Sequence, residues 1–174
     1  MGPGQSNNEI GILANQFGSL RYTNFLHGLG CLISLKDVDR KVTFLGGLNQ
    51  EEGDGDYAYM WEDDVMQVIF HVATLMPNHP ETDPNCNKKK RHIGNNFVAI
   101  VYNNAGDNQV YKIGTVKGQF IYACVVITPL EQGSNRVEIQ CRPELDEPLE
   151  HIKVTYILSY YLFTTINYGS SVGR

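Results

Sequence analysis

One basic run, Lys88–Phe97, holds the residues with the clearest potential for chemistry. Four consecutive cations and a histidine precede Gly94, Asn95 and Asn96 there, in a chain whose net charge is −5. An asparagine carboxamide accepts a hydrogen bond at its oxygen, donates at its nitrogen and does not titrate. Asn95 could therefore place a water molecule beside a phosphate oxygen, the kind of positioning that phosphoryl transfer requires. On residue types alone, a solvated basic turn is the simpler interpretation.

The acidic stretch Glu51–Asp56 resembles a calcium-binding loop only superficially. If Asp54 is taken as the first residue of such a loop, the twelfth is Val65, where a bidentate glutamate is needed. Starting at Glu52 places a tyrosine at the sixth position, which requires glycine. We therefore interpret the stretch as a solvated turn.

The spacing of cysteines and histidines argues against a metal site. The cysteines form no C-x-x-C pair, and no His-x-x-x-His pair follows them. We expect reduced and mostly buried cysteines in an intracellular protein, with no resident metal or cofactor. These cysteines are Cys31, Cys86, Cys124 and Cys141. His71 lies in an apolar run and is interpreted as a core histidine with satisfied hydrogen bonds, rather than as a ligand or base.

Composition is typical of one globular domain. The chain has 174 residues, of which 42% are hydrophobic and 19% charged, enough to bury a sizeable core. An isoelectric point near 5.5 argues against a nucleic-acid-binding function. The longest apolar-leaning run, Val154–Ile166, is too short and too polar to span a bilayer. With no signal-peptide pattern at the N-terminus, we expect a cytoplasmic protein without a transmembrane segment.

Two short helices and a loop are predicted around the basic run and upstream of it. Thr23–Leu29 can form a helix with Thr23 as its N-cap. Lys88–Asn95 is predicted to be a turn or two of helix that Gly94 stops. The proline-punctuated stretch Asn78–Asn87 is predicted to be a loop.

Apolar patterning elsewhere predicts strands. The nearly continuous apolar run Val65–Met76 is predicted to be a buried central strand, and Val98, Ile100 and Val101 are expected in the core. Strands mixed with short helices indicate an α/β fold: a central mixed β-sheet flanked by helices in a single domain. The remaining strands are expected at Cys31–Leu35, Lys41–Leu45, Tyr57–Trp61, Phe97–Tyr102, Phe120–Thr128 and Val137–Cys141.

Several motifs, in their order and spacing, resemble the Rap/Ran-GAP-type catalytic domain of GTPase-activating proteins, most closely its tuberin-like members. The resemblance covers roughly Glu9–Arg142, and its combination of motifs is specific although each alone would be weak. The motifs are Gly18–Tyr22, Phe25–Gly30, Leu45–Leu48, Phe70–Pro77, Lys89–Asn95 and Gly114–Phe120.

This resemblance implies that the chain activates a partner enzyme and has no substrate chemistry of its own. The partner would be a GTP-bound small GTPase, of the Rheb type first and of the Rap or Ral type as alternatives. In this family an asparagine thumb, here Asn95, enters the partner's nucleotide site, and its carboxamide orients the attacking water. GTP and Mg would belong to the partner. The alternative interpretation is a non-catalytic GTPase-binding or scaffold module.

The resemblance also assigns roles to the neighbours of the thumb. The GTPase-binding residues that it implies are Lys89, Lys90, Arg91, His92 and Lys117. Gly94 is expected to let the chain turn just before Asn95. Asn96 stands where the family usually has aspartate, so a carboxylate that could brace the helix is absent. A hamartin-like scaffold, a role in TOR signalling, and attachment to endomembranes through partners are further implications.

The resemblance ends near Arg142. We predict a catalytic domain over residues 1–148 and an atypical tail over residues 149–174, from a truncated chain or a misplaced exon boundary. The family continues there into a long alanine-rich helix, whereas this tail is rich in tyrosine and β-branched residues and has no helical stripe. A sheet face left uncovered by the missing helix would promote association.

Overall fold

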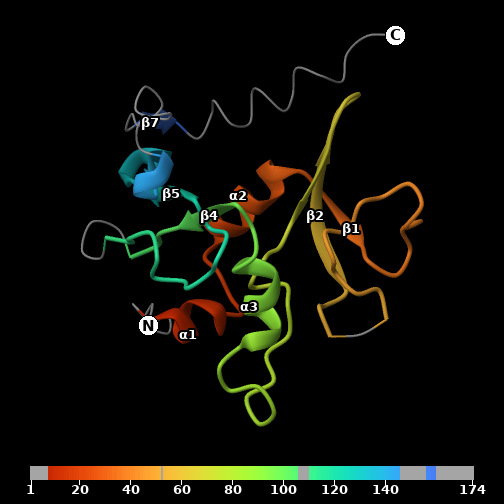
Figure 1. Cartoon of the computed structure of the whole chain (residues 1–174). Helices are drawn as coiled ribbons and strands as arrows, with labels where there is room; N and C mark the ends of the chain where they lie inside the picture. The colour runs from red at the N-terminus through yellow and green to blue at the C-terminus, as the bar shows by residue number, and fades with distance from the viewer. Residues whose placement is uncertain (1–7, 52, 106–109, 146–155, 160–174) are drawn as a thin grey trace, which may run out of the picture. The chain divides into compact units, whose positions relative to one another are not determined.

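The computed structural model describes residues 8–51, 53–105, 110–145 and 156–159 (Figure 1). The chain divides into two compact units. Unit 1 contains residues 1–96 and 116–120, and unit 2 contains residues 97–115 and 121–174. Among the described residues, no helix is long and apolar enough to cross a membrane.

Unit 1 combines three helices with a three-stranded antiparallel sheet in the order β1-β2-β3. The elements are α1 (Glu9–Leu13), α2 (Leu20–Leu29), β1 (Cys31–Ser34), β2 (Tyr57–Glu62), β3 (Gln67–Phe70) and α3 (Asn87–Ile93). The strands predicted at Cys31–Leu35 and Tyr57–Trp61 are therefore confirmed, and so is the short helix predicted at Lys88–Asn95.

Helix α2 begins three residues before the predicted start. The hydroxyl of Ser19 accepts from the amide of Tyr22 at 3.2 Å and caps the helix. The predicted N-cap, Thr23, lies inside the first turn, and its own hydroxyl donates back to the carbonyl of Ser19. The prediction was wrong because both hydroxyl residues are suitable caps, and the sequence pattern alone does not rank them.

Two predicted strands of unit 1 are wrong because aspartate-centred turns replace them. At Lys41–Leu45 the carboxylate of Asp39 accepts from the amide of Lys41 at 2.9 Å, which folds the segment into a turn. In the run Val65–Met76, Asp63 accepts from two successive amides, and only Gln67–Phe70 is a strand. That strand, β3, lies at the edge of the sheet.

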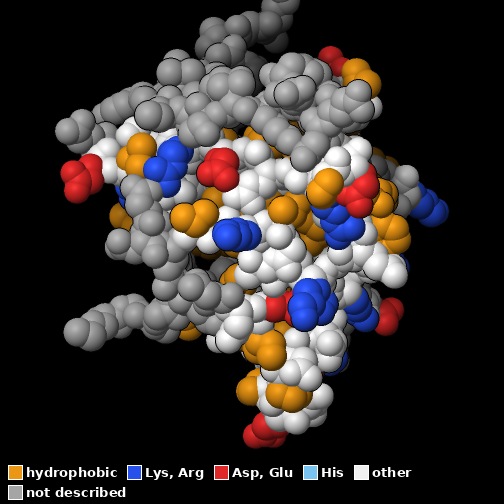
Figure 2. All heavy atoms as spheres, turned by 60° about the vertical axis from the view of Figure 1, so that its left-hand side comes forward, with side chains coloured by type: hydrophobic (Ala, Val, Ile, Leu, Met, Phe, Trp, Pro, Cys, Tyr) orange, Lys and Arg blue, Asp and Glu red, His pale blue; other side chains and the backbone are white. Residues whose placement is uncertain are grey.

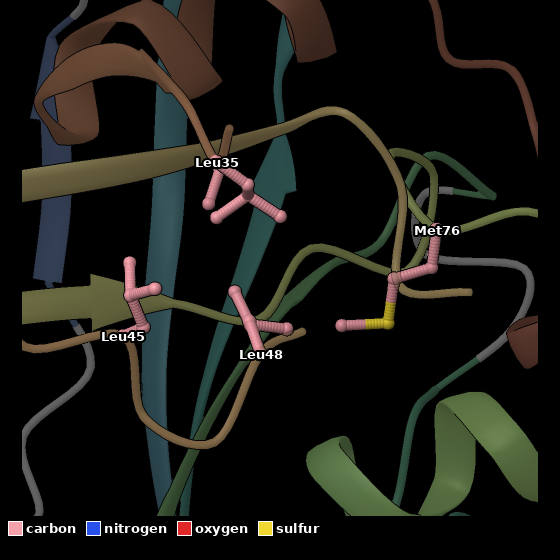
Figure 3. Close-up of a cluster of buried hydrophobic side chains, with 5 residues drawn as sticks. Leu35, Leu45, Leu48 and Met76 are labelled. Carbon is pink, nitrogen blue, oxygen red and sulfur yellow. The ribbon is translucent and has the colours of Figure 1, made fainter. Parts of the chain in front are cut away.

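Both faces of the unit 1 sheet are covered, since β2 alternates its side chains between two apolar clusters. Ala58 packs with loop residues on one face, and Tyr59 packs with α2 on the other. Figure 3 shows side chains of the first cluster converging from the loops that follow β1 and β3. That cluster consists of Leu35, Leu45, Leu48, Ala58 and Met76, and the second of Leu26, Tyr59 and Val72.

Unit 2 is built on a four-stranded sheet in the order β4-β5-β6-β7. The pair β4–β5 is parallel and the other two pairs are antiparallel, so this sheet is mixed. Its elements are β4 (Val98–Tyr102), β5 (Ala123–Pro129), the 3-10 helix η2 (Glu131–Gly133), β6 (Ser134–Cys141), the 3-10 helix η3 (Pro143–Leu145) and β7 (Tyr156–Ser159). The α/β class is confirmed, with the strands divided between two sheets.

Strand β4 lies at the edge of this sheet, and one of its faces is exposed. Val98 and Ile100, predicted to be core residues, have 54% and 41% of their surface exposed. Strand β7 falls within the tail predicted over residues 149–174, and the rest of that tail lies outside the described residues. The domain boundary at residue 148 stays a prediction.

The cluster around Leu48 generates a stability prediction. Leu48→Ala removes a buried side chain and leaves a cavity, so the free energy of unfolding should fall by about 2–5 kcal/mol. Val42→Ala removes apolar atoms from an exposed side chain in the same segment and should change it by less than about 0.5 kcal/mol. Urea denaturation of both variants measures the difference, and equal effects would contradict the assignment of this core.

Candidate functional site

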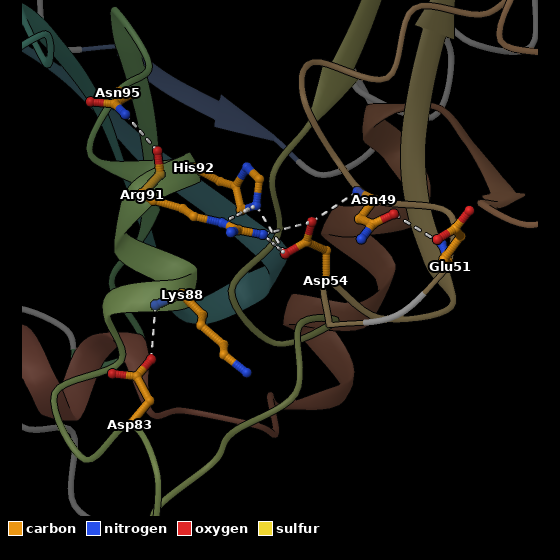
Figure 4. Close-up of polar contacts among 8 residues, drawn as sticks. All are labelled: Asn49, Glu51, Asp54, Asp83, Lys88, Arg91, His92 and Asn95. Carbon is orange, nitrogen blue, oxygen red and sulfur yellow. Dashed lines mark hydrogen bonds and ion pairs between the residues drawn. The ribbon is translucent and has the colours of Figure 1, made fainter.

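The first turn of α3 is fixed by a carboxylate three residues upstream of its N-cap. Asp83 accepts from the backbone amides of Lys88 at 2.8 Å and Asn87 at 2.9 Å (Figure 4). These bonds hold the pKa of the Asp83 carboxyl below its usual value, and the bond from Lys88 has the largest effect. Cys86, between them, has a left-handed backbone with φ of 55°. The helix therefore starts at a defined place.

Lys89 anchors the same helix from inside unit 1. Its side chain is 2% exposed, and its ammonium donates to the carbonyls of Leu13 at 2.9 Å and Ala73 at 2.8 Å. Burial lowers its pKa. Burial leaves Lys89 little surface for the predicted contact with a partner GTPase, and that contact stays a prediction. Its role here is to join α3 to the end of α1 and to the segment after β3.

Glu9 ties the middle of α3 to a neighbouring segment. Its carboxylate pairs with the ammonium of Lys90 at 3.0 Å and accepts from the backbone amide of Lys117 at 2.7 Å. The Lys90 side chain is partly buried by this pairing. The side chain of Lys117 is exposed. Two of the predicted partner-binding cations are thus brought together by one carboxylate.

The last turn of α3 is held by Asp54, a residue that the sequence analysis assigned to a solvated turn. Asp54 is 2% exposed and accepts from Arg91 Nη2 at 2.9 Å and from the amide of Asn49 at 2.8 Å (Figure 4). Its Oδ1 also lies 2.9 Å from His92 Nε2. Burial alone would raise the pKa of Asp54, but the bonds from Asn49, His92 and Arg91 outweigh it and lower the pKa below its ordinary value.

Glycines on both sides of Asp54 allow this burial. Gly53 and Gly55 have φ of 106° and 98°, which other residues rarely adopt. A Cβ atom on Gly55 would collide with the carbonyl of Leu75. The Gly-Asp-Gly pattern was the signal in the sequence that could have identified a constrained turn with an inward aspartate.

His92 is buried as well, which leaves it little surface for its predicted contact with a partner, and that contact stays a prediction. Its Nε2 lies 3.0 Å from Arg91 Nε as well as near Asp54. A single imidazole nitrogen cannot accept from Arg91 and donate to Asp54 at once, so the tautomer of His92 selects one of these bonds. In either tautomer the ring stays within the cluster of Asp54, Arg91 and His92.

His71 packs edge-on against His92, with ring centroids 5.2 Å apart. Both of its ring nitrogens are buried, and neither has a hydrogen-bond partner of normal geometry. The prediction that His71 lies in the core is thus correct for its two ring nitrogens. The prediction that these nitrogens are hydrogen-bonded is wrong. Burial and the neighbouring His92 lower the pKa of His71, which keeps the ring neutral at physiological pH.

Asn95 lies exposed just past the end of α3, and its side chain is held in one orientation. Its Nδ2 donates to the backbone carbonyl of Arg91 at 2.7 Å (Figure 4). A carbonyl can only accept, so the amide nitrogen must face the helix and the amide oxygen must face away from it. The arrangement presents a fixed hydrogen-bond acceptor at the end of a short helix.

Gly94 allows close packing rather than an unusual turn. Its φ and ψ are −70° and −13°, ordinary helical values, so the predicted reason for a glycine here is wrong. A Cβ on Gly94 would lie 3.3 Å from the carbonyl of Lys117, and a Cβ on Gly118 would collide with the carbonyl of Gly94. Asn96 follows Asn95 and is partly buried, and its backbone N–H donates to the backbone carbonyl of Ile93.

Within the described ranges, no three His, Cys, Asp or Glu side chains gather as metal ligands would. All four cysteines are free, as predicted, with Cys86 and Cys124 buried and Cys31 exposed.

Comparison with known proteins relates this arrangement to one family. The Rap/ran-GAP family profile matches residues 12–162, which includes α3 and continues through β7. The Tuberous sclerosis 2 protein homolog of Schizosaccharomyces pombe is 45% identical over 139 residues, 79% of this chain and 10% of that protein. The Ral GTPase-activating protein subunit alpha-2 of Mus musculus is 33% identical over 134 residues, 77% of this chain and 7% of that protein.

The structure of the TSC2 GAP domain has the same fold. It aligns with a TM-score of 0.80 and 34% identity, covering 94% of this chain and 85% of that chain. The chain spans a tenth or less of the length of the two relatives named above. Because the profile covers most of the sequence and the fold agrees, this chain belongs to the Rap/Ran-GAP family.

Proposed function

We propose that this chain is a GTPase-activating domain and that Asn95 supplies the group that positions the attacking water in a partner small GTPase. The single observation that carries the proposal is the orientation of its carboxamide. The nitrogen is bound to the carbonyl of Arg91, and the oxygen is turned outward from an exposed position. The relatives named for tuberous sclerosis 2 and for Ral GTPase activation support the class of activity.

The chemistry suits such a group. Phosphoryl transfer depends mainly on positioning and electrostatic stabilisation, with little covalent work for the protein to do. A fixed amide oxygen can accept a hydrogen bond from a water molecule. The water is then oriented with a lone pair of its own oxygen toward the γ-phosphate. Because the carboxamide does not titrate, it works across the cytosolic pH range. GTP and Mg are supplied by the partner, and this chain acts on the partner's reaction only.

Burial narrows the surface that we propose for the partner. Arg91 and Lys117 are exposed, and Lys90 is partly exposed beside Glu9, whereas Lys89 and His92 lie inside. Figure 2 shows a face on which Lys and Arg side chains are scattered among acidic and hydrophobic ones. The net charge of −5 fits docking onto a folded protein better than binding to a phosphate backbone.

A Rheb-type GTPase is the partner that we propose, on the resemblance to tuberin-like members. The Ral GTPase-activating relatives make a Ral-type GTPase the first alternative. A hamartin-like scaffold, a role in TOR signalling and a cytoplasmic location belong to the same proposal. Comparing stimulation of purified Rheb-, Rap- and Ral-type GTPases would rank the partners.

Asn95→Ala should reduce stimulated GTP hydrolysis by at least about 100-fold, because it removes the group that positions the water. The measurement is single-turnover hydrolysis by the GTP-loaded GTPase with saturating domain. Asn24→Ala is the matched control, since it changes an exposed asparagine in α2 and should keep the wild-type rate. Equal stimulation by wild type and Asn95→Ala would refute the mechanism. Binding by wild type without any stimulation would indicate a non-catalytic module.

Lys117→Gln should slow association with the GTPase by about threefold at low salt, with a smaller effect at high salt, because a rim cation acts mainly on encounter. The maximal stimulated rate should stay unchanged. Lys41→Gln removes an exposed cation from the turn at Asp39, outside the proposed surface, and should leave association unaffected. Stopped-flow association rates at two salt concentrations test this. If both variants behave alike, Lys117 is not at the interface.

A further inference from the structure

We propose that Asp54 is a positioning residue for Asn95. Its carboxylate holds the guanidinium of Arg91, and the backbone carbonyl of Arg91 in turn holds the carboxamide of Asn95. The catalytic consequence rests on the proposed function, whereas the positioning itself concerns this chain alone. The two can therefore be tested separately.

Asp54 is built into unit 1 more firmly than a surface ion pair. Its oxygens make four contacts at 2.8–3.3 Å: both accept from Arg91 Nη2, one accepts from the backbone amide of Asn49, and one lies beside His92 Nε2, which donates to it in one of its tautomers. A buried carboxylate with one of these donors removed would be left partly uncompensated. The carboxylate thus fixes the loop around residues 49–55 against the last turn of α3.

The geometry of α3 makes this contact decisive for the thumb. The helix has seven residues, and a helix this short does not hold its own structure in water. Asp54 contacts two consecutive side chains, Arg91 and His92, which fixes the rotation of the last turn about its axis. Asn95 follows Arg91 by four residues and so lies directly beyond that turn. A rotation of the last turn would move the outward amide oxygen.

The other anchors of α3 act elsewhere on the helix. Asp83 binds the amides of the first turn, and the ammonium of Lys89 reaches carbonyls in the interior. Glu9 pairs with Lys90. These contacts hold the helix in place, while Asp54 acts on the residue whose carbonyl binds the thumb. Removal of the Asp54 carboxylate is therefore expected to let the Asn95 side chain move while the other contacts keep α3 folded.

The test compares Asp54→Asn with Asp56→Asn. Asp56 is two residues along the same loop, its side chain is 68% exposed, and it pairs with Lys36 at 3.2 Å on the surface. Both variants remove one negative charge and change no side-chain size. In the ¹⁵N-labelled chain, the side-chain amide signals of Asn95 are identified by their loss in Asn95→Ala. Asp54→Asn should move these signals toward those of a freely rotating asparagine amide, and Asp56→Asn should leave them in place.

Stimulated hydrolysis supplies the second readout. Asp54→Asn should lower the maximal stimulated rate by about 10- to 100-fold, since a small displacement of a positioning group has effects of that size. The concentration of domain that gives half-maximal stimulation should change by less than about threefold, a split that general unfolding would not produce. Asp56→Asn should leave both values unchanged.

Unchanged Asn95 signals in folded Asp54→Asn, or equal shifts in both variants, would overturn the proposal. If Asp54→Asn does not fold, Arg91→Lys replaces it, because lysine keeps a positive charge next to Asp54 and lacks the guanidinium that contacts both carboxylate oxygens. Shifted Asn95 signals in that variant support the proposal, and unshifted signals refute it. If wild type stimulates no GTPase, the proposed function fails, and the amide signals still decide the positioning role.

Discussion

A helix of seven residues gains too few internal hydrogen bonds to keep its direction in water, and α3 is such a helix. Its geometry therefore depends on charged side chains that bind it at successive levels. Asp83 fixes its start, Lys89 its buried side, Glu9 its middle and Asp54 its last turn. Because these partners come from loops and from α1, much of unit 1 contributes to the placement of one exposed carboxamide.

The basic run has a different use from the one that its charge suggests. Four adjacent cations in an acidic chain look like a surface for a negatively charged partner, yet Lys89 bonds only to interior carbonyls and Arg91 is paired with a buried carboxylate. Two of the four cations, Lys90 and Arg91, are thus paired with carboxylates within the unit. Buried and paired charges fix local geometry more than they attract a partner over long range. Removing one member of a buried ion pair strongly lowers the stability of the fold.

The sequence could predict the elements whose signals are local. The short helix at Lys88–Asn95 and the strands at Tyr57–Trp61 and Val137–Cys141 follow from composition and spacing, and the structure contains them. The Gly-Asp-Gly pattern around Asp54 indicates a constrained turn, but it does not identify the partners of the aspartate, which lie 37 and 38 positions further along the chain. The long apolar run Val65–Met76 misled because its first two residues lie exposed in a turn held by Asp63, and only Gln67–Phe70 is a strand.

The close approach of Gly94 and Gly118 has a consequence for inherited variation. Every replacement of glycine adds at least a Cβ atom, and at position 118 that atom would meet the carbonyl of Gly94 whatever the rest of the new side chain. Charge, polarity and size of the substituent would then matter little. A replacement at this position would displace Gly94, the residue directly before Asn95, while leaving the polar side chains of α3 unchanged. What such a replacement disturbs is the close spacing between the backbones of Gly94 and Gly118.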